Sequence, residues 1–262
     1  MEQRWLSPVR SDPARAAVSP GEVVLFDLDG TITRRDTYLA YLIGFLARHP
    51  GRLPRAAPLP LAVLLHFAGR RDNTWLKTSF LRAVLGGLPR AILESWTRTF
   101  LDRVLATGLR TRALETTERH RAAGHRLMLV TASLDFYAEP LGARLGFDDV
   151  LCTRAAFDDT GRLTGELDGG NCYGATKLER VRQHLTAATA DARITCYADH
   201  HTDLPLLRFA HAPVAVNPTD RLRRAAVALG IPIEDWDAEP VRAAKPLPGQ
   251  TSDAPVAVKD VS

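Results

Sequence analysis

Short apolar runs alternate with stretches of helical spacing along most of this chain. Four of the runs are almost continuously apolar, as is typical of strands buried on both faces of a sheet. They are residues 23–26, 127–130, 193–197 and 213–216. A fifth run, residues 150–154, precedes the turn sequence Asp158-Asp159-Thr160-Gly161, which favours a small hairpin. Strands that alternate with helices predict an α/β fold whose parallel sheet is covered on both faces.

Residues 36–123 depart from this alternation. Apolar side chains recur there at helical spacing, and prolines and glycines separate the helical stretches. These stretches cover residues 38–46, 75–84 and 92–101. We therefore expect a helical insert, residues 36–123, between the first and second strands of the α/β core.

The remaining residues divide between the core and two terminal segments. We assign residues 21–35 and 124–237 to the core, because they carry the predicted strands. Residues 1–20 contain three prolines and no apolar period, and residues 238–262 are rich in proline, alanine and aspartate. We expect these segments to be a disordered leader and a disordered tail.

The composition is that of a globular protein. Hydrophobic residues make up 45% of the 262 residues and charged residues 24%, which excludes a collagen-like repeat, a coiled-coil rod and a wholly disordered chain. The three cysteines are scattered, so we expect neither a disulfide framework nor a structural zinc site. The N-terminus lacks the apolar segment of a secretory signal, and no apolar run reaches the roughly 20 residues of a spanning helix. We expect a cytoplasmic protein.

The net charge of +4 is unevenly distributed along the chain. Residues 34–123 contain 16 Lys and Arg but only 6 Asp and Glu, a net charge of +10, which leaves −6 for the rest. One interpretation is an arginine-rich, solvated helical surface. The other is a surface that attracts anions such as phosphate esters, acidic lipid headgroups or nucleic acid. We do not expect nucleic acid to be a partner.

Candidate chemistry begins at the end of the first strand. Asp27 and Asp29 stand two residues apart in the sequence Asp27-Leu28-Asp29-Gly30-Thr31. Open α/β sheets place their ligands at the carboxyl ends of parallel strands. Buried carboxylates without a partner are costly, so a cation is expected there, most naturally Mg²⁺ with its preference for oxygen ligands. A capping loop is the alternative interpretation of such a pair.

Other strand and helix ends carry polar groups that suit a phosphate. Thr131 and Ala132 follow the second strand, where backbone N–H groups could bind phosphate oxygens or simply cap a helix. Lys177 lies in the first turn of a predicted helix, where the helix dipole disfavours a cation unless an anion compensates it. Asp199 and Asp203 bracket the turn after the third strand.

Together these four elements resemble the motifs of the haloacid dehalogenase superfamily of phosphohydrolases, in particular the branch that contains phosphoserine phosphatases. The similarity covers about residues 22–235: an Asp-x-Asp-Gly-Thr motif, a strand-end threonine, a lysine and an acidic Asp-x-x-x-Asp loop. The position of the insert resembles the C1-type helical cap of that family. The resemblance implies a Rossmann-like core with an all-helical cap, and a magnesium-dependent phosphatase that forms an aspartyl-phosphate.

The resemblance also implies roles for individual residues. Asp27 would attack phosphorus, and Asp29 would protonate the leaving group and then activate water. Asp27, the backbone carbonyl of Asp29 and Asp199 would hold Mg²⁺. Lys177 would neutralise negative charge on Asp27 and on the phosphoryl group, with Asp203 as a supporting residue.

Four further residues are expected to bind the substrate. Thr131 and the amide of Ala132 would contact phosphoryl oxygens, and Thr202 in the acidic loop is a third candidate. Asp36 occupies the position of a glutamate that contacts the substrate amine in phosphoserine phosphatases. The shorter side chain and the longer insert of this chain argue against phosphoserine itself.

Two features leave alternatives open. His200 and His201 are unusual neighbours for the expected metal site, and loop histidines without a ligand role are the alternative. Residues 56–68 are largely apolar, and a short helix there would either pack inside the insert or lie in a membrane interface. We expect residues 58–68 to be mostly buried.

We therefore predict an enzyme that hydrolyses a small-metabolite phosphomonoester with Mg²⁺ as cofactor. One alternative is a phosphatase of phosphatidylglycerophosphate-type lipids at the membrane surface. Another is a non-catalytic phosphate-binding module on the same fold, which the presence of every catalytic residue disfavours. The sequence indicates neither the particular ester nor an oligomeric state.

Overall fold

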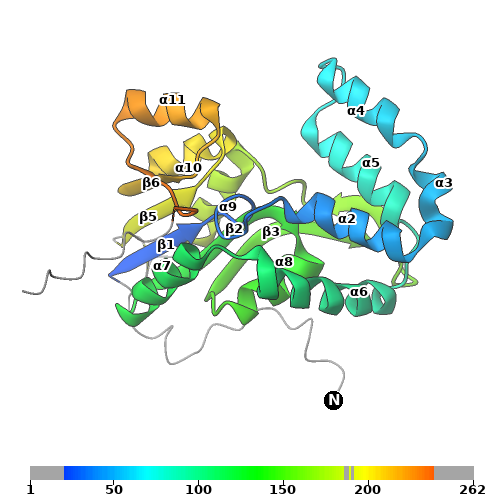
Figure 1. Ribbon diagram of the computed structural model, residues 1–262, viewed down its shortest axis with the longest axis horizontal. Coiled ribbons are helices and arrows are strands. Elements are labelled where there is room, and N and C mark those ends of the chain that lie inside the picture. The colour runs from blue at the N-terminus through cyan, green and yellow to red at the C-terminus, as the bar shows by residue number, and fades with distance from the viewer. Residues whose placement is uncertain (1–20, 186–188, 190–191, 239–262) are drawn as a thin grey trace, which may run out of the picture.

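A computed structural model describes residues 21–238 of the protein, apart from residues 186–188 and 190–191. The predicted leader lies outside these residues, and so does the predicted tail after its first residue. The order of the strands across the sheet is β4-β3-β2-β1-β5-β6-β7 (Figure 1). The strands are β1 (Glu22–Phe26), β2 (Arg126–Leu134), β3 (Asp149–Phe157), β4 (Leu163–Asp168), β5 (Arg193–Ala198), β6 (Ala212–Val216) and β7 (Ile233–Glu234).

The sheet is parallel except at one edge. Strand β1 lies between β2 and β5 and pairs parallel with both, so that Val24 is aligned with Leu127 on one side and Thr195 on the other. Strands β3 and β4 pair antiparallel and form the hairpin that the turn sequence predicts. The predicted α/β fold class with a mostly parallel sheet is confirmed. Strand β7 has only two residues, too few for a periodic signal in the sequence.

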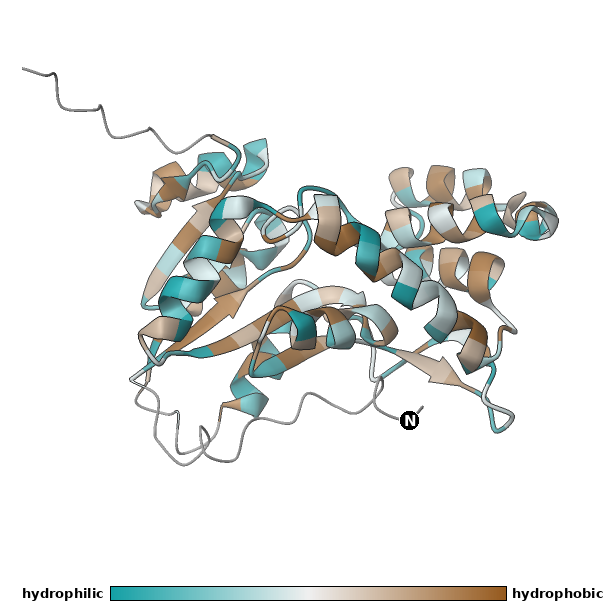
Figure 2. Ribbon diagram, turned by 60° about the horizontal axis from the view of Figure 1, so that its bottom comes forward, coloured by the Kyte–Doolittle hydropathy of each residue, from teal (hydrophilic) through white to brown (hydrophobic). Residues whose placement is uncertain are grey.

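Helices cover both faces of this sheet because alternate strand residues point to opposite sides. Val24 and Phe26 belong to the apolar cluster that includes residues of α7 (Thr111–Ala122) and α8 (Asp135–Arg144). Val23 and Leu25 belong to a second cluster on the other face. That cluster includes residues of α9 (Ala175–His184), α10 (Leu204–Phe209) and α11 (Asp220–Leu229). Much of the sheet is accordingly hydrophobic (Figure 2).

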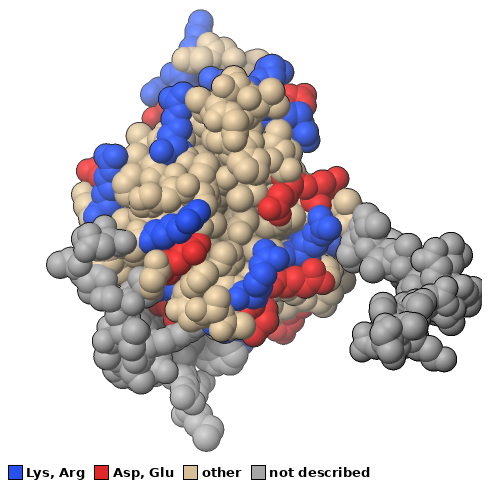
Figure 3. Space-filling model, turned by 90° about the vertical axis from the view of Figure 1, so that its left-hand side faces the viewer, with Lys and Arg blue, Asp and Glu red and all other residues tan. Residues whose placement is uncertain are grey.

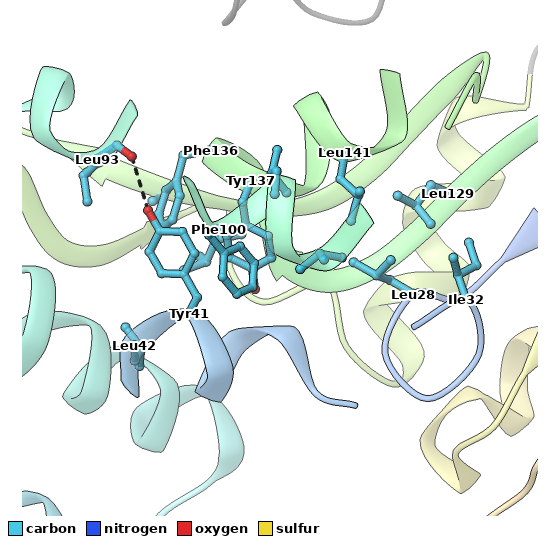
Figure 4. Close-up of a cluster of buried hydrophobic side chains, with 14 of the residues drawn as sticks. Leu28, Ile32, Tyr41, Leu42, Leu93, Phe100, Leu129, Phe136, Tyr137 and Leu141 are labelled. Carbon is cyan, nitrogen blue, oxygen red and sulfur yellow. Dashed lines mark hydrogen bonds between the residues drawn. The ribbon is translucent and has the colours of Figure 1, made fainter. Parts of the chain in front are cut away.

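The insert folds into helices beside the sheet (Figure 1). The α-helices before α7 are α2 (Thr37–Arg48), α3 (Leu53–Ala56), α4 (Leu59–Phe67), α5 (Asn73–Leu85) and α6 (Arg90–Arg103). Tyr41 of α2 is fully buried where the insert meets α8, and its ring stacks on Tyr137 at 5.1 Å (Figure 4). The Tyr41 hydroxyl lies 3.0 Å from Thr97 Oγ1 and donates to Leu93 O at 3.4 Å. This aromatic cluster joins the insert to the core.

The β3–β4 hairpin makes a second junction with the insert. The backbone N–H of Gly87 donates to Leu163 O at 2.7 Å, and Leu163 N–H donates back to Leu88 O at 2.9 Å. Arg82 of α5 forms an ion pair with Glu166 of β4. The division into a core and a cap at residues 36 and 123 remains our proposal.

The expectation that residues 58–68 are mostly buried is wrong. In α4 only Leu59 and Ala62 are buried. The exposed fractions of Leu61, Leu64 and Phe67 are 58%, 64% and 81%. Helix α4 is apolar on all sides but packs mainly against α5, so a single neighbour covers only one side of it. Within the described residues, no helix has the length and apolar character needed to cross a membrane.

Candidate active site

The ends of β1 and β5 bring two carboxylates together. Asp27 follows β1 directly and Asp199 follows β5, and the two strands are neighbours in the sheet. Gly30 then turns the chain away with φ of +81°. A Cβ atom at Gly30 would lie 2.2 Å from Asp199 Oδ2, so only glycine allows this close approach. The two predicted metal ligands therefore share one side of the site.

Lys177 in the first turn of α9 has the anionic partners that its position requires. Its Nζ donates to Asp27 Oδ1 at 2.6 Å and lies 2.9 Å from Asp203 Oδ1. Burial by itself would lower the pKa of Lys177, but Asp203 and Asp27 raise it well above its usual range. The lysine is therefore a fixed positive charge beside the Asp27 carboxylate.

The side chain of Asp29 is held away from this ion pair. Its Oδ1 accepts a hydrogen bond from the backbone N–H of Thr37 at 2.7 Å, and its Oδ2 accepts from Ser133 Oγ at 2.7 Å. Burial and the neighbouring charge of Asp27 raise the pKa of Asp29. A positioned carboxyl group whose pKa is raised holds its proton more readily than a free carboxyl group, which suits general acid and base catalysis. Ser133 belongs to the predicted strand-end segment, but the sequence did not indicate that it contacts Asp29, and Thr37 belongs to no predicted motif.

Three carboxylates form a group that fits a divalent cation. Ligand oxygens of Asp27, Asp199 and Asp203 all lie within 4.8 Å of one another. Asp199 Oδ1 is buried and has no hydrogen-bond partner among the described residues. Burial and repulsion from Asp27 and Asp203 raise the pKa of Asp199 to about 8, and burial raises that of Asp27 to about 6. An oxygen-only donor set with an unsatisfied carboxylate suits a hard divalent cation such as Mg²⁺.

The predicted phosphate-binding residues lie in the pocket above these carboxylates. Strand β2 continues to Leu134, beyond the predicted end, so Thr131 and Ala132 are strand residues and not a helix cap. Thr131 Oγ1 accepts a hydrogen bond from the backbone N–H of Ser133 at 3.0 Å. Both Thr131 and Ala132 line a pocket of about 360 Å³ together with Asp27, Asp29 and Lys177.

The remaining candidates, Asp36 and Thr202, also line this pocket. Asp36 lines it and also caps α2, because its Oδ1 accepts from Leu39 N–H at 2.6 Å. Thr202 lines the pocket as well, with its Oγ1 2.9 Å from His200 Nδ1. His201 Nε2 lies 3.1 Å from an Arg221 nitrogen and does not line this pocket. The pocket is also lined by Arg34, Arg35, Asn73, Tyr173 and His200.

The sequence reasoning also missed Lys77, which reaches from the insert to the core. Its Nζ donates to Ala132 O at 2.6 Å and to Asn171 Oδ1 at 2.9 Å, and its side chain is buried. Burial lowers the pKa of Lys77 to about 8, although Asp29 and Asp36 oppose this shift. The signal in the sequence was a lysine four residues before Leu81, on the apolar face of α5.

The comparisons with known proteins agree with this geometry. The family model of haloacid dehalogenase-like hydrolases matches residues 24–208, which include both aspartate motifs, the strand-end threonine and the lysine. The chain belongs to the haloacid dehalogenase-like hydrolase family.

Similar proteins support the same assignment to the haloacid dehalogenase-like hydrolases. The chain is 32% identical over 241 residues to the "Inhibition of morphological differentiation protein" of Streptomyces azureus, covering 88% of this chain and 83% of that protein. It is 28% identical over 218 residues to the phosphoserine phosphatase SerB1 of Mycobacterium tuberculosis, covering 80% and 70%. A solved structure of a protein of unknown function from Bordetella pertussis Tohama I superposes with a TM-score of 0.72 at 28% identity, covering 82% and 98%. The predicted resemblance and the prediction of a phosphatase-type hydrolase are confirmed.

Proposed function

We propose that this protein is a Mg²⁺-dependent phosphatase that hydrolyses a small-metabolite phosphomonoester through an aspartyl-phosphate on Asp27. The observation that carries the proposal is the pairing of Asp27 with Lys177 at 2.6 Å on the floor of a pocket. Asp29, two residues further on, is held separately by Thr37 and Ser133. One carboxylate is thus available as a nucleophile and a second as an acid and base.

Two displacements at phosphorus account for the reaction. A carboxylate oxygen of Asp27 attacks phosphorus, the bond to the ester oxygen breaks, and Asp29 gives its proton to the leaving alkoxide. Asp29 then takes a proton from a water molecule, whose oxygen attacks phosphorus and releases Asp27 and phosphate. Lys177 stabilises the negative charge on the transferring group in both steps. Mg²⁺, held by Asp27, Asp199 and the backbone carbonyl of Asp29, would supply charge neutralisation when bound.

The pocket favours a small substrate. A volume of about 360 Å³ is near the lower limit for ligand pockets. Asp36 and Thr202 also line this pocket, and they would contact the part of the substrate beyond the phosphate. SerB1, a relative over most of the chain, is named a phosphoserine phosphatase. This supports a small phosphate ester as the substrate class.

The proposal is tested with para-nitrophenyl phosphate in the presence and absence of Mg²⁺. We expect Mg²⁺-dependent release of phosphate, which Asp27→Asn abolishes without loss of the fold. Asp102→Asn is the matched control, because the Asp102 side chain is 75% exposed and pairs with Arg144 away from the pocket. A panel of phosphometabolites and lipid phosphates then identifies the ester. Absence of turnover on every ester would support the non-catalytic alternative.

A further inference from the structure

Helix α4 presents an apolar surface that no other described element covers. Leu61, Leu64 and Phe67 follow one another at intervals of three residues, which places them on the same side of a helix. Their exposed fractions rise from 58% to 81% along the helix. Leu53 in the neighbouring helix α3 is 54% exposed. Contiguous exposed apolar side chains of this size mark an interaction surface.

Positive charge predominates around this surface, and the first acidic residue after it in the sequence is Asp72. Between Asp36 and Asp72 the sequence contains five arginines and no acidic residue. Three of them, Arg55, Arg70 and Arg71, are exposed and flank α4 in the sequence. None of the three forms an ion pair with a carboxylate of the described residues. The end of the molecule formed by α10 and α11 differs, because basic and acidic side chains lie side by side there (Figure 3).

A second copy of the chain fits this surface poorly. A two-fold contact would bury Phe67 against its counterpart but would also bring the flanking arginines of both copies together. No carboxylate lies among residues 37–71 to pair with them. Like charges placed across an interface oppose binding. A partner that accepts apolar side chains and carries dense negative charge would cover the exposed apolar surface and pair with the arginines.

We propose that the α3–α4 end of the insert, residues 53–71, binds the surface of a bilayer that contains anionic lipid. Leu61, Leu64 and Phe67 would enter the interface, and the three arginines would contact headgroup phosphates. With 9 residues, α4 is about 14 Å long, so it lies along the interface and does not cross it. A single short element gives reversible binding. The inference is independent of which ester the pocket hydrolyses.

The test is co-sedimentation of the full-length protein with vesicles. We expect binding to an equimolar mixture of phosphatidylglycerol and phosphatidylcholine, no binding to phosphatidylcholine alone, and weaker binding as salt screens the arginines. Leu64→Asp is expected to lower the partition coefficient at least about tenfold. Val227→Asp on α11 is the matched control, because Val227 is 71% exposed in the region of mixed charge, and it is expected to bind like the wild type. Phe67→Ser is a second variant, should Leu64→Asp fail to fold.

Three results would overturn the proposal. The protein could sediment equally with neutral and anionic vesicles, or it could sediment with neither. The third is a dimer in analytical ultracentrifugation that Leu64→Asp dissociates, which would make this surface a contact between copies. Hydrolysis of para-nitrophenyl phosphate by Leu64→Asp in the absence of vesicles is expected to equal that of the wild type. A failure of the membrane inference is therefore distinguishable from a failure of the proposed chemistry.

Discussion

The floor of the pocket buries charged side chains, whereas the outer side of α4 exposes apolar ones. On the floor, Asp27, Lys177 and Asp203 are at most 8% exposed, and the lysine lies within 3 Å of both carboxylates. On α4, Leu64 and Phe67 are more than half exposed, and the nearby arginines have no acidic partner in the described chain. Buried charge and exposed apolar surface are each costly alone. Each therefore indicates a place where the protein meets another molecule.

The two regions also differ in what fixes their geometry. The floor is built on strand ends, which the register of β1 with β5 holds in place. Helix α4 rests mainly on α5. Substitutions on the floor should therefore affect chemistry, substitutions between α5 and the core should affect folding, and substitutions on the outer side of α4 should affect neither.

After Asp27→Asn, which abolishes turnover, the largest effect is expected at Asp29. Asp29→Asn removes the exchangeable proton but keeps the shape of the side chain beside Thr37 and Ser133. We expect kcat to fall by about 10²- to 10⁴-fold, the usual contribution of general acid–base catalysis. Steady-state kinetics with para-nitrophenyl phosphate measure the change. A loss below tenfold, with circular dichroism unchanged, would assign the proton transfer to another group.

Two leucines of the insert sharpen the comparison of buried and exposed sites. Leu81 of α5 is fully buried, and Leu64 of α4 is 64% exposed. Leu81→Ala is expected to lower the free energy of unfolding by about 2–5 kcal/mol. Leu64→Ala is expected to change it by no more than about 0.5 kcal/mol. Urea denaturation of both variants measures these free energies of unfolding. If the two variants lose similar amounts of stability, α4 is covered in solution.

Addition of Mg²⁺ should stabilise the floor of the pocket. A cation relieves the repulsion among Asp27, Asp199 and Asp203, and a ligand at 100 times its Kd stabilises a protein by about 2.7 kcal/mol. The expected result is a higher Tm of the wild type in a Mg²⁺ titration and a much smaller shift for Asp199→Asn. Equal shifts in the two proteins would place the cation elsewhere.

Much of the pocket floor was predictable from the sequence, and the physical reason is the sheet. Asp27 and Asp199 each follow an apolar run, and neighbouring parallel strands bring their carboxyl ends to one edge. Lys177 could be expected to have an anionic partner because of its place in the first turn of α9. Contacts between the insert and the core, such as Lys77 with Ala132, depend on packing that no local pattern encodes. The exposure of α4 was mispredicted for the same reason, because an apolar helix does not show how many neighbours cover it.

A pH-dependent effect on stability is expected at Lys77, which reaches from the insert to the core. Lys77→Met leaves the carbonyl of Ala132 without its donor, a loss of about 1–3 kcal/mol that removal of a buried charge partly offsets. The pKa of about 8 in the folded protein lies below the usual 10.5, so the unfolded chain binds more protons between these values. The folding equilibrium constant of the wild type should therefore rise with pH there, by at most about tenfold per pH unit.

The Lys77 prediction is checked by urea denaturation at pH 8 and pH 9.5. The rise attributable to Lys77 should be absent in Lys77→Met, so the stability difference between the two proteins should change with pH. If the stability difference between the wild type and Lys77→Met is the same at both pH values, Lys77 keeps its usual pKa in the folded protein.

The covalent role of Asp27 is tested most directly by trapping the phosphoenzyme. The wild type is mixed with Mg²⁺ and a phosphate ester that it hydrolyses, and the reaction is quenched in acid. Borohydride is then added, which reduces an aspartyl-phosphate to homoserine. Peptide mass spectrometry then locates the modified residue. The account predicts homoserine at position 27 in the wild type and none in Asp27→Asn. Phosphate release without a modified aspartate, or modification at a different residue, would contradict it.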